Sequence, residues 1–203
     1  ESTLSGIVRA AAPIVIAAQG ELITERAGVI NLSLDGSIML SAMTAHAVTR
    51  TTGSLTQGVL AAMAVGAAMA FVVVFSSIAL RLNQVAVGFV LTILGADLAI
   101  FLGKPHFNQV GREIPHLPIP VLKDIPLIGP VLFNHNILIY ISLILVVAVT
   151  FYIYRTRAGL TLRAIGEHPE AAFVRGTPVN ALRYVYTLAG GALLYVLGLV
   201  VMA

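Results

Sequence analysis

No charged side chain interrupts TTGSLTQGVLAAMAVGAAMAFVVVFSSIAL, residues 51–80. An α-helix needs ~20 predominantly apolar residues to cross the ~30 Å hydrocarbon core of a bilayer. This stretch is long enough, and the charges that bound it, Arg50 and Arg81, lie just outside. It therefore predicts a transmembrane helix and makes the chain an integral membrane protein.

The composition of the whole chain agrees with this prediction. Hydrophobic residues make up 58% of the 203 residues, charged residues only 10%, and the mean hydropathy is +0.96. A soluble domain carries about a quarter charged residues, so these charges are too few to cover a globular surface. The absence of cysteine excludes a disulfide framework and a thiolate metal site. The basic pI of about 9.5 is interpreted as a record of membrane topology, not of nucleic-acid binding.

Working outward from 51–80, six apolar runs of spanning length are found. They lie at residues 4–22, 29–49, 56–80, 84–103, 136–154 and 183–203. The predicted fold is all-α, a polytopic membrane helix bundle with about six transmembrane segments, some of them discontinuous, in a single domain over 1–203. The last run is still apolar at Ala203, so we expect a partial or shortened form of a longer protein.

The basic residues predict the orientation of the bundle. Five of the twelve Lys and Arg lie after the fifth run, and short basic loops remain cytoplasmic, so the loop 155–182 is expected inside. Alternation then places the N-terminus and the loop 104–135 outside. That outer loop is rich in proline, which cannot continue a helix, so we expect an ordered cap or an extended segment. The five basic residues are Arg155, Arg157, Arg163, Arg175 and Arg183.

Small residues recur every four positions in two of the runs. Such spacing lets helix backbones approach closely in lipid, although membrane helices are rich in Ala and Gly in any case. The stripes are Gly58, Ala62, Gly66 and Ala70 in the third run, and Gly95, Ala99 and Gly103 in the fourth.

The sequence contains no catalytic signature. It has no G-x-x-x-x-G-K-[ST], G-x-G-x-x-G or H-E-x-x-H motif, and its five histidines are scattered. Ser33 and His46 could be placed in the roles of an intramembrane serine protease, but Ser33 lacks the surroundings of a nucleophile turn. We expect a protein that is not an enzyme and cannot hydrolyse ATP by itself.

Two stretches share the pattern Asn-x-x-x-x-Gly where an apolar run begins. They are NLSLDG at 31–36 and NQVAVG at 83–88. Transporters build solute sites from interrupted helices at corresponding positions, which makes these stretches a candidate solute pathway. The alternative is that each Asn only caps a helix. The candidate pathway residues are Asn31, Ser33, Asp35, Gly36, Asn83 and Gln84.

Four carboxylates raise further expectations. Asp35 is expected about one turn inside the second span and Asp97 within the fourth, where ionisable groups usually face a cavity or a partner. Asp97 could instead reach the outer interface. Glu21 lies with Glu25 and Arg26 in a cytoplasmic patch, and we expect these residues to pair locally or with Arg81.

The polar stretch RTRAGLTLRAIGEHPEAAFVRG, residues 155–176, predicts two short helices. The first breaks around Gly166 and Pro169, His168 and Pro169 start the second, and Gly176 ends it. Such a unit on the cytoplasmic face could dock a partner. The alternative is that its arginines only anchor the topology.

These motifs carry a resemblance to a known family. GELITERAGVINLSLDG (20–36) resembles a signature of the permease subunits of ABC importers for nucleosides and simple sugars, which are related to branched-chain amino-acid permeases. RTRAGLTLRAIGEHPEAAFVRG resembles the cytoplasmic loop of the same family, and RLNQVAVGFVLTILG (81–95) and LPIPVLKDIPLIGPVLFN (117–134) also fit its pattern. The similarity runs in order along essentially the whole chain.

The resemblance implies half of an importer in a bacterial cytoplasmic (inner) membrane. Its partners would be cytoplasmic ATP-binding subunits, a second permease in a homo- or heterodimer, and an extracellular or periplasmic substrate-binding protein. No cofactor is implied on this chain, because ATP and Mg would be bound by the ATPase. The implied solute is a nucleoside or a related simple sugar. The residues that match the family's ATPase-coupling loop are Gly166, Glu167, Pro169, Glu170, Ala171, Ala172 and Gly176.

Three positions depart from the family pattern. Asp35 stands where Glu is common, Ser37 where an apolar residue is common, and His168 where Asn is common. The first two weaken the prediction of the solute. The main alternative function is an ion-coupled secondary transporter, in which Asp35 and Asp97 would bind ions, and co-purification with an ATPase would distinguish the two. A non-transporting remnant of a permease is a further alternative.

Overall fold

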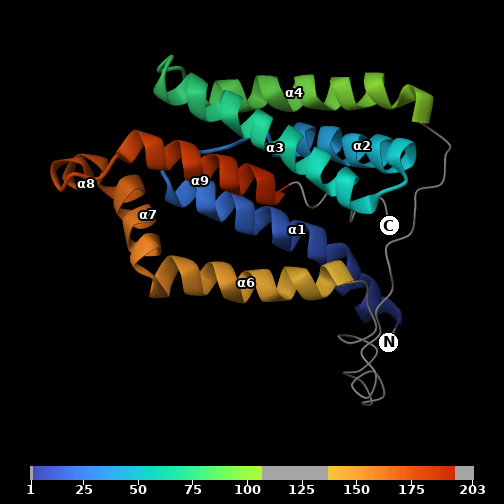
Figure 1. The fold of residues 1–203 in the computed structure, drawn as a ribbon, viewed down its shortest axis with the longest axis horizontal. Coiled ribbons are helices and arrows are strands. Elements are labelled where there is room, and N and C mark those ends of the chain that lie inside the picture. Colours follow the sequence, from blue (N-terminus) through green and yellow to red (C-terminus); the bar gives the residue numbers. More distant parts are fainter. Residues whose placement is uncertain (1, 107–136, 195–203) are drawn as a thin grey trace.

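The computed structural model describes residues 2–106 and 137–194, and within these ranges every regular element is helical (Figure 1). The elements in chain order are α1 (Ser2–Arg26), α2 (Leu34–Thr52), α3 (Leu55–Ile78), α4 (Gln84–Gly103), the 3₁₀ turn η1 (Lys104–His106), α6 (Ile137–Arg155), α7 (Arg157–Glu167), α8 (Pro169–Val174) and α9 (Val179–Leu194). The all-α prediction is confirmed.

Long helices lie at each of the six predicted apolar runs. Helices α1, α2, α3, α4, α6 and α9 correspond to the runs in order. Of the predicted outer loop 104–135, only Lys104–His106 is described, and the end of the last run also lies outside the described residues.

By length and apolarity, α3 and α4 qualify to cross a membrane. A third span is added if α6 and α7, which meet at a bend of 75°, count as one broken span. Polar side chains lower the hydropathy of α2, where Asp35, Ser37, Ser41 and Arg50 occur. The described part of α9 has 16 residues, so it is too short to meet the same criterion.

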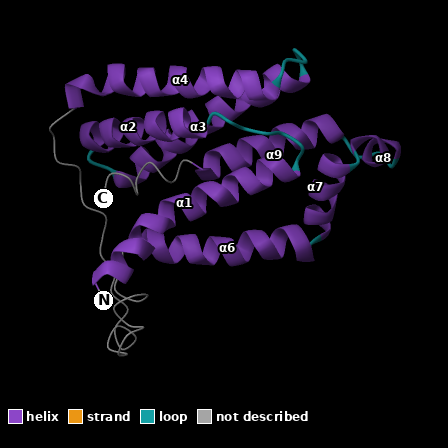
Figure 2. Cartoon of the chain, turned by 180° about the vertical axis from the view of Figure 1, so that it is seen from behind, coloured by secondary structure: helices purple, strands orange, loops and turns teal. Residues whose placement is uncertain are grey.

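The long helices run side by side, with α4, α2 and α3 in one half and α9, α1 and α6 in the other (Figures 1 and 2). Helix α3 packs against both α2 and α9, α2 against α4, and α1 against α9 and α6. The connections 27–33 and 79–83 lie at the end that carries α7 and α8, whereas α2 turns into α3 at the opposite end. The loops therefore alternate between the two ends, as the predicted topology requires.

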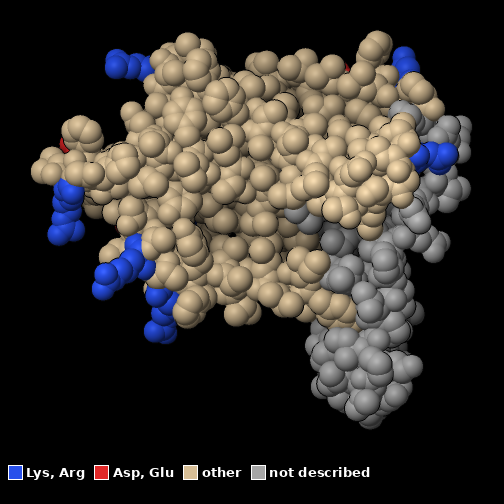
Figure 3. Space-filling view, in the orientation of Figure 1, with Lys and Arg blue, Asp and Glu red and all other residues tan. Residues whose placement is uncertain are grey.

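The visible surface has the charge distribution of a membrane bundle. Lys and Arg side chains lie at the two ends of the face in Figure 3, and a broad belt between them carries none. Large apolar side chains are exposed along α4 and α6, including Phe89, Ile93, Ile144 and Val147. Exposed apolar side chains at this position are expected where the surrounding medium is hydrocarbon.

The stripes of small residues form helix contacts, as the sequence predicts. Gly58, Ala62, Gly66 and Ala70 are all buried on α3, and the small residues of α4 are buried on its inner face. A Cβ atom at Gly95 would lie only 2.8 Å from the backbone of Gly36. Helices α2 and α4 can therefore cross this closely only because both positions are glycine.

Helix α2 begins at Leu34, five residues later than the predicted start at 29. Asn31 accepts a hydrogen bond from the backbone N–H of Ser33, and Asn and Ser side chains that bond locally in this way compete with helix formation. Asp35 therefore lies in the first turn of α2 and is exposed, and its depth inside the second span stays a prediction. An acidic residue in the first turn is stabilised by the helix dipole.

Candidate functional site

The segment 27–33, between α1 and α2, is non-helical yet largely internal. Gly28 has a φ of +81°, a conformation that glycine adopts without steric cost. Val29, Asn31 and Ser33 are at most 1% exposed. The backbone N–H of Asn31 donates to Oε1 of Glu21 at 3.2 Å, which fixes the segment to α1.

Asn31 belongs to a buried chain of polar groups. Its Oδ1 accepts from the N–H of Ser33 at 3.1 Å and from the hydroxyl of Ser33 at 2.6 Å. Ser37, one turn further along α2, donates to Oγ of Ser33 at 3.1 Å. All three side chains have no exposed surface. Asn31 thus orders the entry of α2 but is not its N-cap, which is Ser33.

Asn83 has a different role from Asn31. It is the N-cap of α4, and its Oδ1 accepts from the N–H groups of Val85 at 2.9 Å and Ala86 at 3.4 Å. The oxygen of Asn83 therefore caps a helix, as the alternative interpretation of the motif predicts. The two Asn-x-x-x-x-Gly motifs match in spacing, but their asparagines are not structurally equivalent.

The two motif segments nevertheless meet in the fold. Oε1 of Gln84 accepts from the N–H of Ile30 at 2.7 Å, and the hydroxyl of Thr92 donates to the carbonyl of Leu32 at 2.7 Å. A Cβ at Gly88 would lie 2.9 Å from the side chain of Leu32. Gly36 in turn lies against the backbone of Thr92. Both motif glycines therefore permit close contact between the two segments.

A groove with a volume of about 520 Å³ opens beside this contact. This volume lies in the range of small-molecule sites, and the polar side chains of the groove are a carboxylate and two amides. Asp35 and Asp97 do not line it, and both are exposed elsewhere on their helices. The lining residues are Glu25, Gly28, Ile30, Leu82, Asn83, Gln84 and Val85.

The stretch 155–176 folds as two helices, as the sequence predicts. Thr156 caps α7, its hydroxyl oxygen accepting from the N–H of Gly159 at 3.0 Å. The break falls at His168, Pro169 opens α8, and Gly176 follows it with a φ of +83°. The predicted coupling residues all lie on or beside these two helices, at one end of the bundle (Figure 1).

Helix α8 presents apolar side chains to its surroundings. Phe173 is 72% exposed and Val174 is 85% exposed, and Glu170 and Ala171 are exposed beside them. Ala172 faces inward and is 5% exposed. The inner side of the unit belongs to an apolar core formed by Ala27, which directly follows α1, and by buried side chains of α6, α7, α8 and α9, among them Ile153 and Leu162.

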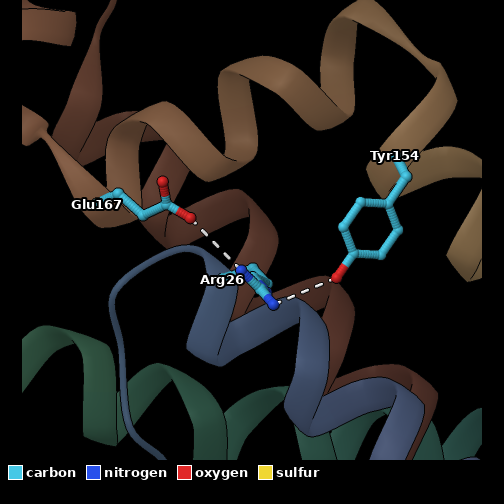
Figure 4. A network of polar contacts seen from close by, with 3 residues as sticks. All are labelled: Arg26, Tyr154 and Glu167. Carbon is cyan, nitrogen blue, oxygen red and sulfur yellow. Dashed lines mark hydrogen bonds and ion pairs between the residues drawn. The ribbon is translucent and has the colours of Figure 1, made fainter.

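A polar contact joins α7 to the end of α1. Arg26 forms an ion pair with Glu167 at 3.4 Å and donates to the hydroxyl of Tyr154 at 3.2 Å (Figure 4). The guanidinium of Arg163 lies 5.4 Å from the centre of the Tyr154 ring. The expectation that Glu21, Glu25 and Arg26 pair locally or with Arg81 is therefore wrong for Arg26. Sequence reasoning missed this partner because 141 residues separate Arg26 from Glu167.

Within residues 2–106 and 137–194, no group of His, Asp and Glu side chains is arranged to hold a metal ion. The chemistry available at the groove is hydrogen bonding by amides, a carboxylate and backbone groups, which is suited to recognition of a polar solute.

Comparisons with known proteins agree with this geometry. Residues 3–203 match the model of the family described as the branched-chain amino acid transport system / permease component. The chain is 37% identical over 192 residues to TsgC13, a candidate glucose ABC transporter permease protein of Haloferax volcanii, covering 93% of this chain and 58% of the relative. It is 30% identical over 196 residues to the guanosine ABC transporter permease protein NupQ of Bacillus subtilis, covering 89% and 60%.

A third relative is the nucleoside ABC transporter permease protein NupC of Lactococcus lactis, which is 28% identical over 192 residues, covering 89% of this chain and 61% of the relative. The chain thus spans about three-fifths of the length of these relatives. No solved structure matches it. The family match runs along nearly the whole chain, and the chain folds as an all-helical membrane bundle. The chain therefore belongs to the branched-chain amino acid transport system / permease component family.

Proposed function

We propose that this chain is a permease subunit of an ATP-driven importer that translocates nucleosides or related simple sugars across the cytoplasmic membrane. The observation that carries the proposal is the position of α8. This exposed helix lies at the same end of the bundle as the groove and is connected through α7 to the segment 27–33. A force applied to α8 from outside the bundle can therefore reach the groove.

Helix α8 has the surface of a docking element. Phe173 and Val174 are largely exposed at the polar end of the molecule, beside Glu170 and Arg175. A large apolar side chain held in water is stabilised when a partner buries it. A cleft on a cytoplasmic ATPase subunit would provide that burial. ATP and Mg are then bound by the ATPase and not by this chain.

The groove favours a neutral, hydroxylated solute. Asn83 and Gln84 offer amide groups, and Glu25 offers a carboxylate that accepts from hydroxyls. Ribose and hexose rings present such hydroxyls. The names of the relatives, which refer to glucose, guanosine and nucleosides, support the same solute class.

The remaining features of the proposed importer are those that the family resemblance implies, with the orientation that the basic residues predict. A second permease, identical or different, completes the pathway, and an extracellular or periplasmic binding protein delivers the solute. The end with α7 and α8 faces the cytoplasm, and the N-terminus lies outside.

Reconstituted vesicles test the proposal directly. The permease is purified with the ATP-binding subunit that co-purifies with it, and uptake of radiolabelled guanosine, uridine, ribose and glucose is measured with and without ATP. We expect uptake of at least one of these solutes that depends on ATP and on the binding protein. Uptake driven by an ion gradient in the absence of ATP would instead support an ion-coupled secondary transporter.

A further inference from the structure

Arg183, near the start of α9, is hydrogen-bonded to two other parts of the bundle. Its Nε donates to the carbonyl of Ala27 at 3.1 Å, and its Nη2 donates to the carbonyl of Ile165 at 3.0 Å. Ala27 directly follows α1, and Ile165 lies in the last turn of α7. One guanidinium thus joins α1, α7 and α9.

The two acceptors suit an arginine for a physical reason. The last carbonyls of a helix have no partner within it and carry the negative end of its dipole. A guanidinium offers several N–H donors in a fixed plane, so it can bond two separate carbonyls at once, whereas a lysine ammonium is a compact charge on a flexible stem. The contact therefore depends on the shape of the arginine as well as on its charge.

Two glycines make room for this contact. A Cβ at Gly28 would lie 2.9 Å from Nη2 of Arg183 and 3.2 Å from Cα of Gly166. A Cβ at Gly166 would collide with the carbonyl oxygen of Arg26. The backbone after α1 and the last turn of α7 therefore touch directly, and the guanidinium holds both from one side.

The other polar contact between α1 and α7 is weaker. In the Arg26–Glu167 ion pair the two side chains are 35% and 59% exposed, and exposed pairs of this kind contribute little because water screens them. Arg183 is partly buried and bonds to backbone atoms. Of the two contacts, that of Arg183 is better able to transmit a displacement.

We propose that Arg183 is a positioning residue that makes the segment 27–31 move together with α7 and α8. The inference rests on the proposed function, because it takes α8 as the helix on which the ATPase acts. Arg183 does not line the groove. It acts through Gly28 and the buried Val29 and Asn31, which follow Ala27 along the chain. A displacement of α8 is thereby passed to the groove, whose lining includes Gly28 and Ile30.

Distance measurements test the inference in the assembled transporter. The chain has no cysteine, so Ile30→Cys and Leu160→Cys, both at exposed side chains, give a unique pair of spin labels on the segment and on α7. Electron spin resonance then measures their separation without nucleotide and with ATP trapped, after dilution with unlabelled permease. With Arg183 in place, we expect one narrow distance distribution that is the same with and without ATP. When Arg183→Met is added, we expect the distribution to shift or broaden on ATP binding. A wild-type distance that changes on ATP binding, or one that Arg183→Met leaves unaltered, would overturn the inference.

Transport measurements give an independent readout. Arg183→Lys and Arg183→Met are compared with Arg157→Met, which removes the same charge from an exposed position at the start of α7. We expect both Arg183 variants to assemble and to hydrolyse ATP at wild-type rates. We expect their uptake rates to fall about tenfold, which lies within the usual range of coupling between two sites. The Arg157 variant should match the wild type.

The possible outcomes distinguish the inference about Arg183 from the proposed function. Unchanged uptake in Arg183→Lys and Arg183→Met refutes the inference while leaving the proposed function intact. If uptake, ATP hydrolysis and the amount of assembled protein fall in parallel in both variants, Arg183 only stabilises the fold, and the inference is also refuted. Failure of the wild type to take up solute with ATP refutes the proposed function itself.

Discussion

At the scale of single residues, two asparagines with the same motif spacing perform different tasks. Asn31 is fully buried and accepts both hydrogen bonds of Ser33, so it shapes the backbone ahead of α2. Asn83 is exposed at the groove and uses its oxygen to cap α4. The amide nitrogen of Asn83 is not needed for the cap and is the group we assign to the solute.

Substitution of Asn83 separates its capping role from solute binding. Asn83→Ser keeps an N-cap oxygen, whereas Asn83→Ala removes it at a cost of ~1 kcal/mol in stability. We expect Asn83→Ser to melt like the wild type but to raise the KM for uptake about fivefold, the effect of one hydrogen bond worth ~1 kcal/mol. Thermal unfolding and uptake kinetics are measured on all three proteins. Wild-type KM in the serine variant would show that Asn83 is only a cap.

At the scale of elements, α7 and α8 combine a fixed inner side with an exposed outer side. Leu162 and Ile165 of α7 and Ala172 of α8 lie in a shared core with α1, α6 and α9. Phe173 and Val174 contribute nothing to that core. Changes on the outer side should therefore affect binding of a partner without affecting the fold.

Phe173→Ser tests this separation. We expect the variant to fold and insert as the wild type does, because the side chain is 72% exposed, but to bind its ATPase more weakly by ~2 kcal/mol, as for other aromatic anchors of interfaces. Co-purification and titration with the ATPase subunit give the measurement. Leu80→Ser, at an exposed position in the connection after α3, is the matched control and should bind normally. Equal binding by Phe173→Ser and the wild type would exclude α8 as the docking helix.

At the scale of the whole molecule, the connections alternate between two ends, and on the face in Figure 3 a belt without Lys or Arg separates these ends. The end with α7 and α8 carries the connections 27–33 and 79–83, and the other end carries Gly53 and Ser54. If the end with α7 and α8 faces the cytoplasm, a reagent that cannot cross the membrane should reach only the opposite end from outside the cell.

Single cysteines placed in the cysteine-free chain test the orientation. In intact cells, a membrane-impermeant maleimide should label Thr52→Cys and leave Val174→Cys unlabelled, since these exposed positions lie at opposite ends. After permeabilisation both should react. The reverse pattern in intact cells would invert the proposed topology.

The positions of the long helices could be predicted because apolar length is a local property of the sequence. The buried stripe from Gly58 to Ala70 was predictable for the same reason. The late start of α2 depends on a side-chain hydrogen bond from Ser33 to Asn31, which hydropathy does not register. The contacts Arg26–Glu167 and Arg183–Ala27 join residues more than 140 positions apart, and nothing in the local sequence marks these partners.

Because α6 and α7 meet at a bend of 75°, a small rotation of α7 about this bend moves its far end over a larger distance. Helix α7 has 11 residues, so at ~1.5 Å per residue it is an arm of about 16 Å that lies across the other helices. If the arm pivots at Thr156, a rotation of about 10° moves its far end by about 3 Å, close to the width of a water molecule. In the proposed importer, a modest turn of α8 by an ATPase would thus displace the end of α7 that contacts Gly28 by about the width of a water molecule.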